Sequence, residues 1–140
     1  MSNALNINTG VVEYTLNDTV KVCFNPTDFS FIERLFNTFD TLDKKQDAYK
    51  AEIDKTNDNI ELFRITRRMD EEMRESIDAL FGTPVCADLL GGVNIYALAD
   101  GLPIWANILL AVMDEVDTSY AREQKATNPR VQKYLKKYKK

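Results

Sequence analysis

The chain contains no histidine among its 140 residues. Histidine is the commonest general base in enzymes and the commonest metal ligand, so its absence removes the most frequent donor for both kinds of site. There are only two cysteines, Cys23 and Cys86, and they do not form a CxxC pair. We expect both to be buried, reduced thiols in a cytoplasmic protein, with a disulfide as the alternative.

Glycine and proline are also scarce, at five and four residues, which argues against long linkers. The longest apolar stretch is shorter than the roughly 20 residues that a membrane-spanning helix needs. No signal peptide is visible at the start, where Ser2–Ala4 could be native or an expression remnant. We expect one domain over residues 1–140, made of a flexible arm (1–10), a β-hairpin (11–24), a helical body (25–123) and a basic tail (124–140).

Charge is distributed unevenly along the chain. Residues 1–123 hold 22 acids and 11 bases, whereas seven Lys or Arg and no acid follow Gln124. The tail contributes the candidate basic residues Lys133, Lys136, Lys137, Lys139 and Lys140. Lysines interleaved with tyrosines can bind nucleic acid, but the acidic body opposes that approach. We therefore expect a tail that is disordered, or that folds on an acidic partner or on the body itself.

Two segments near the N-terminus alternate apolar and polar residues, which is typical of half-buried strands. They cover residues 11–16 and 19–24, and Asn17-Asp18 between them suits a tight hairpin turn. One face would carry Tyr14, Leu16, Val20, Val22 and Phe24. A lone hairpin is marginally stable in water, so this face must pack on helices or on another chain.

Residues 28–81 follow a helical pattern that permits two interpretations. Phe29, Ile32, Leu35, Phe36, Phe39 and Leu42 predict a rich apolar face at the start. Beyond Leu42 the apolar residues become sparse and then resume. The segment is therefore either one very long helix or an antiparallel helical hairpin that turns near residues 56–59, with Asp58 and Glu61 capping the second helix.

The most apolar stretch runs from Leu102 to Tyr120 and predicts the central core helix. Pro103 suits its first turn, where a missing N–H costs nothing. Trp105 and Ile108 lie in the middle of the apolar arc, and we expect both to be buried. The fold class predicted from these elements is α+β and mainly α, with an N-terminal β-hairpin, a long helix or helical hairpin, and a C-terminal helical core.

Four apolar residues recur near the coiled-coil interval in the charged stretch from Asp43 to Thr66. They are too few to form a core of their own. We expect them to bind a helix of another chain or of a second copy, or alternatively to pack within a helical hairpin. These candidate partner-binding residues are Tyr49, Ile53, Ile60 and Phe63.

A dense acidic cluster suggests a different function. Glu71, Glu72 and Glu75 occupy adjacent turns of one helix, a spacing that resembles the magnesium motif of the all-helical nucleotide pyrophosphohydrolases of the MazG type. That resemblance implies further carboxylates from a later helix, a part that Asp114 and Asp117 could take. The alternative is a solvated face with the i, i+4 pairs Arg67–Glu71, Arg68–Glu72 and Asp70–Arg74. We expect the carboxylates not to converge.

A family resemblance favours binding over catalysis. The short hairpin, the start Phe24-Asn-Pro-Thr-Asp28 of an aromatic helix and the exit Leu42-Asp-Lys-Lys45 resemble small tail-region proteins of long-tailed phages and prophages of Gram-positive bacteria, described as tail assembly chaperone-like. The resemblance implies a non-enzymatic, cofactor-free protein of the host cytoplasm that binds tape-measure or tail-tube protein. It transfers no site residues. The alternatives are the pyrophosphohydrolase and a nucleic-acid-associated phage protein.

Overall fold

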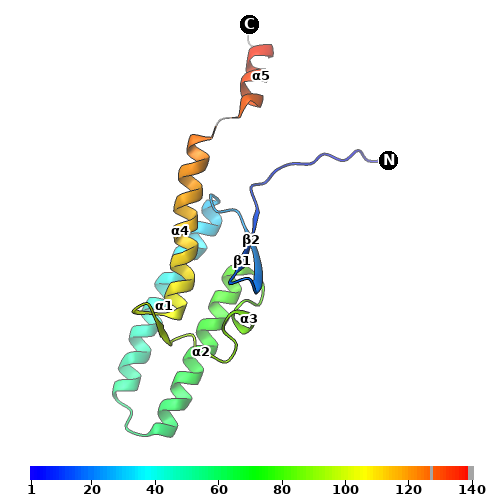
Figure 1. Cartoon of the computed structure of the whole chain (residues 1–140). Coiled ribbons are helices and arrows are strands. Elements are labelled where there is room, and N and C mark those ends of the chain that lie inside the picture. The colour runs from blue at the N-terminus through cyan, green and yellow to red at the C-terminus, as the bar shows by residue number, and fades with distance from the viewer. Residues whose placement is uncertain (127, 139–140) are drawn as a thin grey trace.

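The computed structural model describes residues 1–126 and 128–138 of the chain. It confirms the predicted fold class, with an N-terminal antiparallel hairpin followed by long helices. Helices α1 and α2 lie antiparallel, α4 runs beside α1, and the hairpin packs near the end of α2 (Figure 1). The N-terminal arm and helix α5 extend away from this body.

The hairpin pairs strand β1 (Val12–Leu16) with strand β2 (Val20–Phe24). Asn17 and Asp18 in its turn have φ angles of 51° and 56°, a left-handed conformation that these short polar residues tolerate. Strand alternation directs one set of side chains onto the helices, as predicted. The same alternation exposes Cys23, so the prediction of a buried thiol is wrong there.

Helices α1 (Phe29–Asp54) and α2 (Asn59–Phe81) form the helical hairpin, and the single long helix is wrong. Both helices begin with an aspartate, Asp28 and Asp58, whose carboxylate accepts a backbone N–H of the first turn. Each cap satisfies a donor that has no partner within its helix. Gly82 ends α2 at φ 71°, a conformation that costs glycine little.

The buried stripe of α1 differs from the predicted one. It consists of Phe31, Leu35, Leu42 and Tyr49. Residues 35, 42 and 49 are seven apart, so they stay on one side of the helix along its whole length and face both α2 and α4. Phe29 and Phe36 fall outside this stripe and are 68% and 56% exposed, so the expectation that they belong to the core face is wrong.

A short connection leads from α2 to the last core helix. Helix α3 (Cys86–Leu90) is followed by two paired two-residue strands, β3 (Leu98–Ala99) and β4 (Leu102–Pro103). A turn at residues 95–96, closed by a hydrogen bond from the Ala97 N–H to the Asn94 carbonyl oxygen, precedes β3. Helix α4 spans Ile104–Lys125 and begins directly after Pro103, which stands before the first turn rather than inside it.

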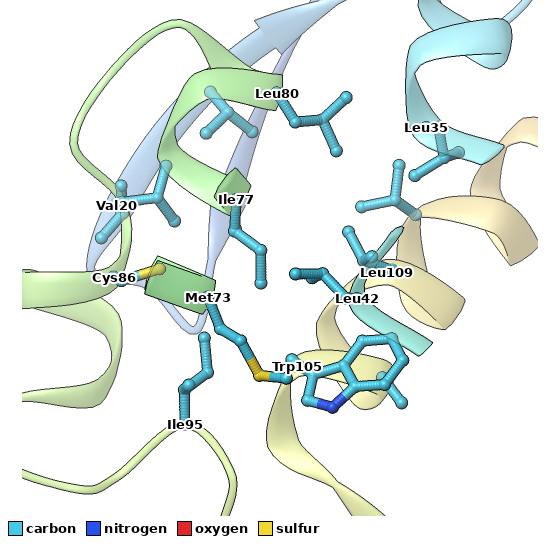
Figure 2. Packing of buried hydrophobic residues seen from close by; sticks show 14 of the residues in the cluster. Val20, Leu35, Leu42, Met73, Ile77, Leu80, Cys86, Ile95, Trp105 and Leu109 are labelled. Carbon is cyan, nitrogen blue, oxygen red and sulfur yellow. The ribbon is translucent and has the colours of Figure 1, made fainter. Parts of the chain in front are cut away.

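Helix α4 crosses the centre of the core, as predicted. Trp105 is 2% exposed and Leu109 is fully buried, and both lie among side chains from α1 and α2 (Figure 2). The Trp105 indole N–H donates to Gln46 Oε1 at 2.7 Å, which satisfies the only polar atom of that ring. Ile108 is only partly buried, so the prediction of its full burial is wrong. Its side of the helix faces an open groove.

Helix α5 (Pro129–Tyr138) follows α4 after a three-residue connection, 126–128. The basic tail is therefore helical at residues 124–125, which end α4, and over Pro129–Tyr138. No helix within 1–126 and 128–138 combines the length and apolar character required to cross a membrane.

Candidate binding surfaces

An apolar depression lies between the β-hairpin, α3, β3 and the first half of α4, and we call it the hairpin–α4 groove. Its volume is about 530 Å³. Its walls are mostly aliphatic and aromatic side chains, contributed by segments far apart in the chain. The lining residues are Tyr14, Thr15, Leu16, Asn17, Phe24, Leu89, Leu90, Ala99, Ile104, Asn107, Ile108, Ala111, Val112 and Glu115.

One end of the groove carries a hydrogen-bonded polar cluster. The Tyr14 hydroxyl donates to Glu115 Oε1 at 3.4 Å, and the Ser119 hydroxyl donates to the same oxygen at 2.8 Å. Arg122 donates to the Ser119 hydroxyl at 3.2 Å. Burial raises the pKa of the Tyr14 phenol, and the Glu115 carboxylate raises it further, so the phenol remains a proton donor at neutral pH.

The acidic residues around the groove give it a negative rim. Asp18, Asp88 and Asp100 are exposed, and each is a chain neighbour of a groove-lining residue. Glu115 adds a carboxylate inside the groove. An apolar floor with an acidic rim is suited to an apolar ligand that carries positive charge at its edges.

The four predicted partner-binding residues are separated into two pairs. Tyr49 is 7% exposed, and the Arg68 guanidinium lies 5.8 Å from its ring centre. Ile53 is partly buried against the core. These two residues therefore hold α1 against α2, which is the alternative that the sequence left open.

The other pair remains on the surface. Ile60 and Phe63 are 74% and 60% exposed on the first turns of α2, at the tip of the helical hairpin. Arg64 and Arg67, also exposed, follow at positions i+4 and i+7 from Ile60. These four residues share one face of the helix, and we call them the α2 tip patch.

The acidic cluster of α2 is used in part for structure. Asp70 pairs with Arg74 at 2.9 Å, as predicted, and also accepts the backbone N–H of Ile95 at 2.7 Å. Arg74 donates to the Val93 carbonyl oxygen at 2.6 Å. The pair therefore fastens the loop before β3 to α2. Sequence analysis identified the i, i+4 pair but missed the loop that it holds.

The remaining carboxylates are dispersed. Glu71 and Glu75 on α2 and Asp114 and Asp117 on α4 are exposed, and Glu72 is half-buried. Within the two described ranges no three acidic or cysteine side chains are grouped so that they could hold a metal ion. The predicted pair Arg68–Glu72 is wrong, because Arg68 instead pairs with Glu52 of α1 at 2.8 Å.

The second thiol is buried and unreactive. Cys86 is 1% exposed, and burial together with the nearby Asp78 carboxylate raises the pKa of its thiol to about 12. Because the thiolate is the nucleophilic form, a thiol with this pKa has almost no nucleophile at neutral pH. Both cysteines are free, and the disulfide alternative is wrong.

Helix α5 is amphipathic, a feature that sequence analysis overlooked although the i, i+3, i+4 spacing signals it. Val131, Tyr134 and Leu135 form its apolar face and are 59%, 47% and 61% exposed. Lys133, Lys136 and Lys137 lie on the same helix, whereas the predicted tail residues Lys139 and Lys140 are outside the described residues. The structure thus contains a basic helix with an unpaired apolar face.

Comparison with known proteins identifies no relative of this chain. No protein family, no curated protein and no solved structure matches the chain.

Proposed function

We propose that this protein is a non-enzymatic, tail assembly chaperone-type protein of a phage or prophage. In this role it binds tape-measure or tail-tube protein in the host cytoplasm before the tail polymerises. The sequence resemblance at residues 24–28 and 42–45 suggests the class.

The observation that carries the binding role is the α2 tip patch. Large apolar side chains left on the surface as a group are typical of contact sites for other proteins. Ile60 and Phe63 supply the apolar anchors, and Arg67 supplies positive charge on the same face, whereas Arg64 pairs with Glu61 at 2.8 Å. The matching partner surface is a helix with apolar residues flanked by acids, and its charges would set selectivity and association rate.

Co-purification tests this proposal. The chain is co-expressed with the tape-measure protein, or separately with the tube protein, of the phage or prophage that encodes it. We expect wild type to capture one of them and the variant Ile60→Asp/Phe63→Asp to capture at least tenfold less. Both substitutions are at exposed positions, and a new carboxylate near the start of a helix is electrostatically favourable, so the fold should be retained.

The matched control is Val93→Asp/Leu98→Asp, which adds the same two charges at exposed apolar residues outside the patch. Leu98 is 74% exposed, as is Ile60, and we expect the control to bind like wild type. The proposal is overturned if wild type captures neither protein, or if the patch variant binds as tightly as the control. Nucleotide hydrolysis that disappears in Glu72→Gln would replace it with the pyrophosphohydrolase.

A further inference from the structure

Independently of the proposed function, we propose that the hairpin–α4 groove receives helix α5 of a second copy of this chain. The groove is apolar with an acidic rim, and α5 is basic with an unpaired apolar face. The two surfaces are therefore complementary in apolar character and in charge. The complementarity extends to the whole chain, because residues 1–123 carry a net charge of −11 and the tail after Gln124 carries seven positive charges.

The apolar contact would form between two small sets of side chains. On α5 the exposed set is Val131, Tyr134 and Leu135. In the groove, Ile108 and Ala111 lie one turn apart on α4, and Ala111 is exposed. Burial of both sets removes apolar surface from water, which is the main driving force of most protein association.

Charge would orient the helix in the groove. Asp18, Asp88 and Asp100 stand beside groove-lining residues, and Glu115 lines one end. Arg130 borders the apolar face of α5, at i−1 from Val131 and i−4 from Tyr134. Pairs of opposite charge at the rim of an apolar contact steer the encounter and disfavour the reverse orientation.

The chain's own α5 is too close in sequence to reach the centre of this groove. The distance along α4 from Lys125 back to Ile108 is ~26 Å, and back to Ile104 it is ~32 Å, at 1.5 Å per residue. The connection 126–128 spans at most ~14 Å. Most of this length is needed to cross the 8–10 Å that separate the axes of two packed helices, so little is left to move α5 back along α4. A back-folded α5 would therefore place Leu135 beside residue 113 or nearer to Lys125, short of the centre of the groove.

A helix supplied by another copy has no such restriction. In Figure 1 α5 continues beyond the end of α4 and points away from the body, so it is presented for an intermolecular contact. Two copies that exchange their α5 helices would close a symmetric dimer. Each copy contributes one helix and one groove, which makes the two halves of the contact separable by mutation.

Sedimentation velocity on the full chain tests the proposal with one variant for each half. Val131→Asp/Leu135→Asp removes the apolar face of α5, and Ala111→Arg places a bulky cation in the groove. Wild type should form a species of twice its 16.0 kDa mass. Each variant alone should associate at least tenfold more weakly, because both copies lack the same half of the contact.

An equimolar mixture of the two variants provides the decisive measurement. One intact groove and one intact α5 remain in each mixed pair, so the mixture should recover dimer that neither variant forms alone. Ala121→Arg, at another exposed position of α4, is the control for the groove and should associate like wild type. Asn128→Asp/Gln132→Asp adds the same two charges to the tail but keeps its apolar face, so it should associate more tightly than Val131→Asp/Leu135→Asp.

Three results would overturn the proposal. The first is a wild type that stays monomeric at about 100 µM, which would leave the centre of the groove to another protein. The second is a variant of either half that associates like wild type. The third is a mixture that recovers no dimer, because the two surfaces would then not be partners.

Discussion

Two adjacent residues of α4, Ile108 and Leu109, should respond very differently to truncation. Leu109 is fully buried among the side chains of α1 and α2, whereas Ile108 is partly exposed in the wall of the hairpin–α4 groove. They are about 100° apart around the helix, at 3.6 residues per turn, so one faces the core and the other faces the groove. The pair therefore tests which side of α4 holds the fold together.

The expected loss of unfolding free energy depends on whether the deleted side-chain atoms leave a closed cavity. Leu109→Ala leaves a closed cavity in the core and should lower the free energy of unfolding by about 2–5 kcal/mol. Ile108→Ala removes atoms that already border an open groove, so no closed cavity forms. Its expected cost is about 1 kcal/mol, because the lost burial is partial and alanine has the better helix propensity.

Urea denaturation measures both variants. Trp105 is the only tryptophan and lies one turn from Leu109, so its fluorescence reports on this part of the core, and circular dichroism provides an independent signal. For a chain of this size a loss of ~3 kcal/mol corresponds to a fall in Tm of roughly 10 °C. The reasoning is refuted if Leu109→Ala costs less than about 1 kcal/mol, or if Ile108→Ala costs as much as Leu109→Ala.

Three further predictions concern the two thiols and the Trp105 indole. At pH 8 a thiol reagent should label Cys23 rapidly and Cys86 only after unfolding; equal rates would contradict the burial of Cys86. The pKa of the Cys86 thiol is about 12 in the folded chain, so the unfolded chain loses the thiol proton at a lower pH than the folded chain does. The free energy of unfolding should therefore fall as the pH rises from about 9 to 12, and it should fall less steeply in Cys86→Ala. Gln46→Ala should cost about 1–3 kcal/mol in urea denaturation, because it leaves the Trp105 N–H buried without an acceptor, and an unchanged midpoint would show that water replaces the amide.

Local features of the chain were predictable because their physical causes act within a few residues. The alternation in 12–24 specified which face of the hairpin is apolar, and Asp58 marked where a second helix would begin if residues 28–81 form a helical hairpin. Trp105 was correctly assigned to the core, since its helix is apolar around most of its circumference. A helix cap or an apolar periodicity is recognised from neighbouring residues alone, without knowledge of the tertiary structure.

The candidate partner-binding residues differ in their exposure. Ile60 and Phe63 are exposed as a partner-binding surface requires, whereas Tyr49 is buried where α1 meets α2. Spacing in the sequence cannot distinguish these cases, because the same interval serves a contact within a chain and a contact between chains. The basic tail was recognised by its charge, but the apolar face of α5 was overlooked among its lysines.

The sequence by itself determined the types of the main elements, most of their ends and the apolar face of the hairpin, because each depends on neighbouring residues. Only the tertiary structure decided that residues 28–81 fold back as two helices, that Phe31 rather than Phe36 is buried, and that Ile108 borders a groove. The physical reason is that burial depends on which element covers a given face. That depends on contacts between residues far apart in the chain, and no local pattern records them.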